Sequence, residues 1–144
     1  MTVSPASVSG AEYYAHDGYY TIDEGPSEWM GEGAQRLGLE GRVKADQFAQ
    51  IIDGVLPDGT ELARGADGTR NNGTDLTFSA PKSVSLVGLI GGDKRVIEAH
   101  RNAVRETMIW AEEKLALARS GAGGAERELT GNLVQAHFHH DLSR

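Results

Sequence analysis

The longest regular pattern in the chain is a stripe of apolar residues that follows Asp93. Its members recur at intervals of three, four or seven residues, the spacing of one face of an α-helix: Ile97, Val104, Met108, Ala111, Leu115 and Ala118. Asp93 is a favourable N-cap residue, and Gly121 is a natural stop. The pattern therefore predicts one long helix from Asp93 to near Ser120. Its charged face, which includes Glu112 and Glu113, is interpreted as solvated.

Shorter elements are predicted on both sides of this helix. Capping signals and helical spacing indicate a short helix that begins at Ser9. They also indicate helices that span residues 27–37, 45–53 and 81–90. Alternation favours a strand at residues 75–79, and one or two antiparallel strands between 126 and 141 that turn near Thr130-Gly131. Helices and short strands do not alternate regularly, which predicts an α+β sandwich.

Composition limits the class of protein. The chain has 144 residues, of which 39% are hydrophobic and 24% charged, and this is typical of one globular domain. Residues 1–10 do not have the pattern of a signal peptide and no segment approaches a membrane span, so no membrane insertion is expected. The absence of cysteine excludes disulfides and thiolate metal sites and suits a cytoplasmic protein. Any metal ion would bind His, Asp or Glu.

The charge distribution is unfavourable for an enzyme of nucleic acids. The net charge is −7, and residues 1–34 contain six acidic residues but no Lys or Arg. Because neutralised phosphates supply most of the affinity of non-specific DNA binding, charge alone argues against it. A nucleophile in this segment would need a metal ion or distant basic residues to attack a phosphate.

Two tyrosine pairs, Tyr13-Tyr14 and Tyr19-Tyr20, contain all four tyrosines of the chain. An activated phenol oxygen can attack a phosphodiester, and the aryl phosphate that forms keeps the energy needed to pass the strand on. Two such hydroxyls in one site would allow a DNA strand to be cut and later rejoined. The alternative is that both pairs simply pack on a core.

A second candidate segment is residues 74–85. It is predicted as a strand that presents one carboxylate, Asp75, followed by a helix that Pro81 begins. The free amide groups of that helix could face an anion. Alternatively, Asp75 is an ordinary cap at the edge of a strand.

A third segment, residues 131–144, holds three of the five histidines. In a strand, side chains alternate between faces. One face would carry Val134, Ala136, Phe138 and His140 and point to the core; the other would carry Gln135, His137, His139 and Asp141. Spacing alone would select His137, His139 and Asp141 as a metal cluster, whereas the alternative is a polar solvent face.

These segments together resemble the TrwC/TraI-type (MobF) conjugative relaxases of the HUH endonuclease superfamily. The matching motifs follow the family's order over almost the whole chain: Glu12-Tyr13-Tyr14 with Tyr19-Tyr20, Ser27-Glu28-Trp29, Gly33-Ala34, Leu37-Gly38-Leu39, residues 75–85, Gly91-Gly92-Asp93-Lys94, residues 130–134, Phe138-His139-His140-Asp141 and Ser143-Arg144. The most specific of them is residues 75–85.

The resemblance implies an antiparallel sheet with packed helices and a DNA-nicking activity. Such relaxases nick single-stranded DNA at a plasmid transfer origin, become joined to the 5′ phosphate and leave a free 3′ hydroxyl. Their expected partners are single-stranded DNA at the transfer origin and other relaxosome and coupling proteins. A rolling-circle replication initiator, which shares paired tyrosines and a histidine metal site, is the alternative enzyme, but residues 75–85 favour the relaxase.

Residue roles follow from motif position. By resemblance, Tyr13 is the nicking nucleophile, and Tyr19 or Tyr20 is the second tyrosine used in strand transfer. Asp75 is the acidic residue beside the metal site, which orients a ligand histidine or helps to activate the tyrosine. His140 is the first of three metal-binding histidines. The implied divalent ion, magnesium or manganese, would polarise the scissile phosphate.

The family's other two ligands follow Ser143-Arg144 in a His-x-His motif, and this chain ends at Arg144. We therefore expect residues 1–144 to be the N-terminal portion of a single, truncated relaxase domain. With an incomplete metal site, the isolated chain is expected to be inactive. The alternative from another class of protein is a non-catalytic remnant that binds single-stranded DNA, another relaxase component, or nothing.

Overall fold

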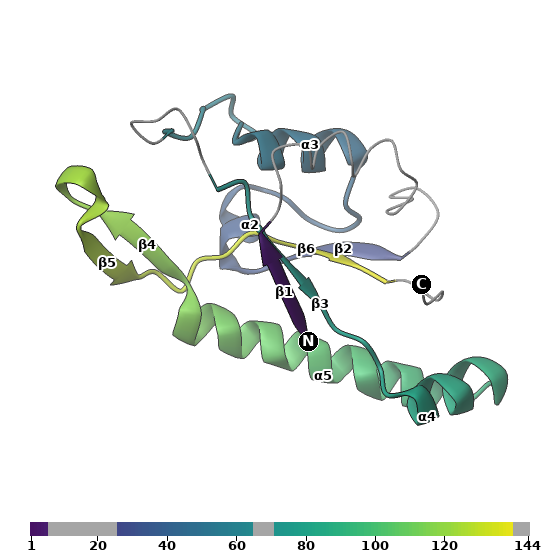
Figure 1. The fold of residues 1–144 in the computed structure, drawn as a ribbon. Helices are drawn as coiled ribbons and strands as arrows, with labels where there is room; N and C mark the ends of the chain where they lie inside the picture. Colours follow the sequence, from purple (N-terminus) through teal and green to yellow (C-terminus); the bar gives the residue numbers. More distant parts are fainter. Residues whose placement is uncertain (6–25, 65–70, 140–144) are drawn as a thin grey trace. The chain divides into compact units, whose positions relative to one another are not determined.

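The computed structural model describes residues 1–5, 26–64 and 71–139 (Figure 1). Its contacts divide the chain into two compact units. The first contains Met1–Met30, Ala34–Thr77 and Gln135–Arg144, and the second contains Gly31–Gly33 and Phe78–Val134. Each unit combines helices with antiparallel strands, so the predicted α+β class is confirmed.

Two antiparallel strand pairs form the framework of the first unit. Strand β1 (Thr2–Pro5) pairs with β3 (Thr74–Thr77), and β2 (Ser27–Met30) pairs with β6 (Gln135–Phe138). The β2–β6 register places Trp29 opposite Ala136. Both pairs join segments that are far apart in the sequence.

The helix predicted at residues 27–37 is wrong over its first half. Residues 27–30 are strand β2, and only Glu32–Arg36 form a helix, α2. Gly31 separates the two with a φ of +92°, a left-handed value that a helix interior does not adopt. The strand exists because β6 supplies its hydrogen-bond partners, which local sequence does not reveal.

The core of the first unit lies between β2, β6 and helix α3 (Ala45–Asp53). Its buried residues are Trp29, Ala34, Leu39 and Val43, and the partly buried side chains of Leu37, Phe48, Ile51, Ala136 and Phe138 pack against them. The Phe48 ring meets that of Phe138 edge to face at 5.3 Å between centroids, and lies 6.5 Å from the centroid of Trp29. Helix α3 has the predicted bounds and ends at Gly54, whose φ is +75°.

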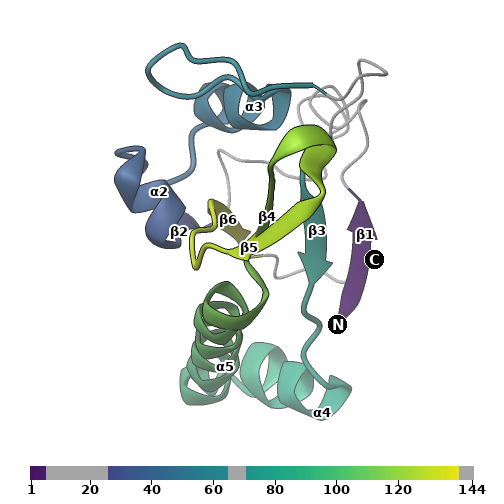
Figure 2. The ribbon, with the colours of Figure 1, turned by 90° about the vertical axis from the view of Figure 1, so that its left-hand side faces the viewer.

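The second unit is built on helix α5 (Lys94–Leu115). Helix α4 (Lys82–Ser85) continues into the π-helix η1 (Leu86–Ile90), so the helix predicted at residues 81–90 is confirmed. Figure 2 shows α4 beside one end of α5. The π-helix η1 lies close to α5 because Gly88 has no side chain: a Cβ there would come within 2.6 Å of Ile97 Cγ1.

The predicted end of the long helix is wrong. Helix α5 ends at Leu115, and residues 117–120 form strand β4 (Leu117–Ser120), which pairs with β5 (Glu126–Leu129). The 3₁₀ turn η2 (Ala122–Gly124) lies between them. Met108 is the buried residue of the predicted apolar stripe, whereas Leu115 is 60% exposed. Backbone and hydroxyl hydrogen bonds from Thr130 to the Ala116 carbonyl, at 2.8 and 3.0 Å, hold the base of this ribbon.

The strands predicted between residues 126 and 141 exist, but they do not pair with each other. Strand β5 pairs with β4, and β6 pairs with β2. The hairpin turn expected near Thr130-Gly131 is therefore wrong, and these residues belong to the segment that leads from β5 to β6. Among the described helices, none is both long and apolar enough to cross a membrane.

Asp93 caps α5 as predicted. Its Oδ1 accepts a hydrogen bond from the backbone N–H of Arg95 at 3.1 Å, and the guanidinium of Arg95 donates to both carboxylate oxygens at 2.9 and 2.7 Å. The guanidinium contact, and to a smaller extent the backbone N–H, hold the pKa of Asp93 below its ordinary value. The capping interaction is therefore strongest when the carboxyl is ionised.

We predict that Asp93→Ala lowers the melting temperature at pH 7. A lowered folded-state pKa contributes stability above the unfolded value, about 3.9, and this is lost as pH falls through the folded pKa. The difference from wild type should therefore shrink below about pH 4. Asp93→Asn keeps the cap acceptor but not the ion pair, so its smaller deficit should vary less with pH. Melting curves followed by circular dichroism measure both; a deficit for Asp93→Ala that grows in acid contradicts the assignment.

Candidate nucleophile and metal site

Most residues proposed for the site lie outside the part of the chain that the structure describes. These are the four tyrosines, Tyr13, Tyr14, Tyr19 and Tyr20, together with His140 and Asp141. The helix predicted from Ser9 also falls there. The structure does describe Asp75, His137 and His139, which lie on or next to strands of the first unit.

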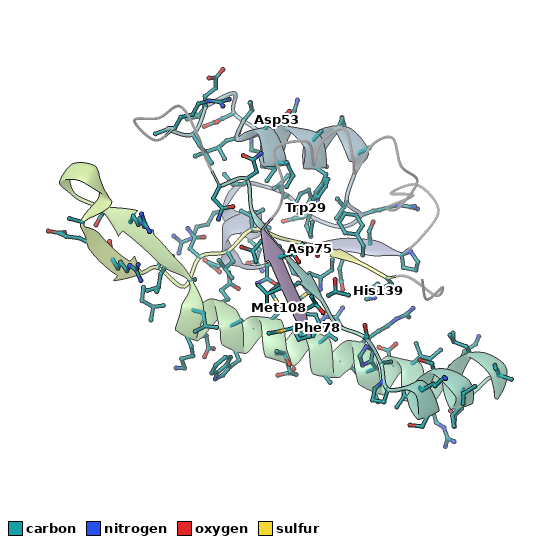
Figure 3. The ribbon with its side chains drawn as sticks, in the orientation of Figure 1. Trp29, Asp53, Asp75, Phe78, Met108 and His139 are labelled. Carbon is teal, nitrogen blue, oxygen red and sulfur yellow. The ribbon has the colours of Figure 1, made fainter. Side chains whose placement is uncertain are left out.

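Asp75 is the second residue of β3, where it lies opposite Ser4 of β1 and is partly buried. The strand predicted at residues 75–79 is thus confirmed, with bounds shifted to Thr74–Thr77. Four consecutive cross-strand pairs hold this short strand in place. The carboxylate is carried by paired backbone on a regular strand, which is a rigid support for a functional side chain (Figure 3).

Pro81 lies immediately before α4, in an extended conformation with ψ of 146°. Its fixed φ suits the entry to a helix, as predicted. The helix then widens at η1, where the Gly91 N–H donates to the Leu86 carbonyl at 2.9 Å. A Cβ on Gly91 would be 2.6 Å from the Val87 carbonyl oxygen, so this wider turn needs glycine at that position.

Strand β6 has the predicted alternation of faces. Ala136 and Phe138 pack against the core, and on the other face Gln135 and His137 meet with 3.0 Å between the imidazole Nε2 and the amide Oε1. Gln135 is only 7% exposed, so the alternative of a simple solvent face is wrong for this residue. The backbone N–H of His139 donates to the Pro26 carbonyl at 3.0 Å, which places His139 beside the start of β2 (Figure 3).

The described residues do not by themselves fit a metal ion. In residues 1–5, 26–64 and 71–139 there is no group of three His, Asp or Glu side chains close enough to share one. The His137 Nε2 lies 3.0 Å from the Gln135 Oε1, so this ring nitrogen already has a partner within the strand. The cluster of His137 and His139 with Asp141 stays a hypothesis, since Asp141 lies outside the described residues.

Sequence reasoning missed one polar residue, Glu112. We interpreted it as part of a solvated face of the long helix, but its Oε1 accepts hydrogen bonds from the backbone N–H groups of Glu32 and Leu133, at 2.8 and 2.7 Å. No local pattern distinguishes Glu112 from its neighbour Glu113, which lies 4.0 Å from the ammonium of Lys114. Only the fold shows which of the two carboxylates is structural.

Comparisons with known proteins identify the family to which this fold belongs. The sequence model of the TrwC relaxase matches residues 7–144. The multifunctional conjugation protein TraI of Escherichia coli is 46% identical over 145 residues, which cover 99% of this chain and 8% of that protein. The TraI of strain K12 has the same identity and coverage.

Solved structures give the same result. The metal-free conjugative relaxase TrwC in complex with OriT DNA has a TM-score of 0.85 and 39% identity, over 99% of this chain and 50% of the other. A metal-bound structure of that relaxase with OriT DNA has a TM-score of 0.75 and 39% identity, over 95% and 49%. The chain belongs to the TrwC relaxase family. It spans about half of these solved chains and 8% of the curated relatives.

Proposed function

We propose that this chain carries the nucleophile-bearing part of a conjugative relaxase, which nicks one DNA strand at a transfer origin. The observation that supports this most directly is the structural similarity, at 39% identity and over 99% of the chain, to a relaxase in complex with OriT DNA. Single-stranded DNA at the transfer origin is the proposed substrate. Other relaxosome and coupling proteins as partners, and a cytoplasmic location, are further parts of this proposal.

The proposed reaction is a transesterification by Tyr13. The phenol oxygen forms a bond to the scissile phosphorus, the bond from phosphorus to the 3′ oxygen breaks, and that oxygen takes up a proton. The product is a 5′ phosphotyrosine that conserves the phosphodiester energy. Tyr19 or Tyr20 would perform the second transfer, and Asp75 would orient a ligand histidine or help to activate the tyrosine.

A divalent ion, magnesium or manganese, is the proposed cofactor. It would supply positive charge at the scissile phosphate, which residues 1–34 do not offer because they contain no Lys or Arg. His140 is its proposed ligand in this chain. The metal-bound and copper-bound structures of the matched relaxase support metal dependence of the family without selecting the ion.

If Tyr13 is the nucleophile, removal of its hydroxyl oxygen should prevent formation of the covalent adduct with DNA. In a version of the protein extended by the family's His-x-His segment, Tyr13→Phe should abolish the covalent adduct with an oligonucleotide that carries the nick site, since Phe keeps the ring and removes the nucleophile. Tyr14→Phe is the matched control and should retain most of the adduct on a denaturing gel. A full yield from Tyr13→Phe would transfer the role to another tyrosine, with Tyr19 the next candidate.

The metal assignment is tested by two histidines of one segment. In the same extended protein, His140→Ala should abolish metal-dependent nicking, and His137→Ala should leave most of it because His137 Nε2 is already bonded to Gln135. The measurement is initial nicking rate against manganese concentration for both variants. Equal losses, or a loss from His137→Ala alone, would assign the ligand to the other face of β6.

The 144-residue chain itself is predicted not to nick. One imidazole and one carboxylate hold a divalent ion much less tightly than three imidazoles, and each absent ligand leaves the geometry open. Incubation with the cognate oligonucleotide and magnesium or manganese should therefore give no tyrosyl-DNA adduct. A clear adduct would show that residues already present, such as His137, His139 and Asp141, complete a site.

A further inference from the structure

One carboxylate oxygen in the second unit accepts hydrogen bonds from two different backbone segments. Glu112, on α5, is partly buried, and its Oε1 lies 2.8 Å from the backbone nitrogen of Glu32 and 2.7 Å from that of Leu133. Hydrogen bonds to an ionised acceptor are stronger than those between neutral groups. Glu112 therefore links three segments that are distant in the sequence.

Two glycines allow these segments to touch. The N–H of Gly33 donates to the Leu133 carbonyl at 2.9 Å. A Cβ on Gly33 would lie 2.6 Å from that carbonyl oxygen, and a Cβ on Gly31 would lie 2.4 Å from it and 3.0 Å from Glu112 Oε1. Neither position accepts a side chain, because the opposing atoms belong to backbone or to the clamping carboxylate.

This contact continues the register of the β2–β6 pair. The last pair of that ladder is Met30 opposite Gln135. Continuing the antiparallel register by two residues brings Glu32 opposite Leu133, the two residues whose N–H groups share Glu112 Oε1. In a longer ladder these N–H groups would find carbonyl acceptors on the opposite strand. Here the Glu112 carboxylate accepts the hydrogen bonds of both N–H groups, and the ladder ends.

The alternation of apolar residues cannot select this register alone. A slip of one residue would turn Ala136 and Phe138 away from the core, so the apolar pattern opposes it. A slip of two residues keeps every side chain on its face, and alternation does not oppose it. It would, however, separate Glu32 from Leu133 and break the shared contact with Glu112.

We propose that Glu112 is a positioning residue that fixes the register of β6 along β2. It thereby sets how far His137 and His139, and the segment leading to His140, extend along the strand. The catalytic consequence of this placement rests on the proposed function, in which a histidine of this segment binds the metal ion.

The structural part is tested in the 144-residue chain by amide hydrogen exchange, followed residue by residue by NMR. Glu112→Ala should speed exchange at the Glu32 and Leu133 amides by about tenfold or more, as expected for loss of a bond to a charged acceptor. Exchange at the His139 amide, bonded to Pro26 at the far end of the pair, should also rise. Helix α3 should change little. Glu112→Gln keeps an acceptor oxygen and should fall between wild type and Glu112→Ala.

Glu113→Ala and Glu113→Gln are the matched controls, since Glu113 is the adjacent carboxylate and is exposed. They should leave all of these amides unchanged. Cross-strand contacts report the register directly: wild type pairs Trp29 with Ala136, and a two-residue slip would pair Trp29 with Phe138 or Val134. A minor set of such contacts in the Glu112 variants supports the proposal. Unchanged exchange at Glu32 and Leu133, or an equal rise throughout α3, overturns it.

The catalytic consequence has a separate readout. In the version extended by the His-x-His segment, Glu112→Gln should lower the rate constant of adduct formation by a larger factor than it weakens binding of the oligonucleotide, whereas Glu113→Gln changes neither. An equal loss in both, or no loss, overturns the positioning role. If neither the extended wild type nor its variants form an adduct, the proposed function fails. The exchange result in the 144-residue chain then still decides whether Glu112 fixes the register of β6 along β2.

Discussion

The packing of three aromatic rings, those of Trp29, Phe48 and Phe138, is the interaction on which the first unit depends. They come from β2, α3 and β6, and so join residues 27–30 and 45–53 to residues 135–138. Each of these elements is short, with nine residues in α3 and four in each strand. Isolated elements of this length are marginal in water, so burial of the rings stabilises the elements themselves as well as their arrangement.

Elements with complete local signals were predictable from the sequence. The spacing of apolar residues gives α3 its predicted bounds, and Asp93 begins α5 because its side chain accepts the Arg95 N–H. The strand that carries Asp75 follows from alternation, with a shift of a residue or two at its ends. In the two helices a residue and its partner lie within a few positions, so the pattern contains most of the physics. Strand β3 is different, because its alternation is local but its partner β1 is distant in the sequence.

Elements whose partners are distant were not predictable in this way. Residues 27–30 have a helix-like sequence context but form β2, because β6 offers a ladder and the core a place for Trp29. Residues 117–120 continue the apolar stripe of α5 but pair with β5 instead. Of the candidate site, the sequence identified the strand positions of Asp75 and His137 and the strand face of His137. It could not identify Glu112, whose two partners lie 80 and 21 residues away.

The chain is acidic, so the proposed chemistry requires a source of positive charge close to the scissile phosphate. A net charge of −7 repels DNA at long range, but salt screens that repulsion beyond about 10 Å. Within that distance a divalent ion outweighs single carboxylates, since Coulomb energy scales with charge and falls with separation. The placement of the histidine segment therefore matters more than the overall charge. A slip of β6 by two residues along β2 would displace its histidines by about 7 Å, which is enough to carry a metal ligand away from the scissile phosphate. In the proposed reaction, the register of β6 is therefore an electrostatic requirement as well as a packing requirement.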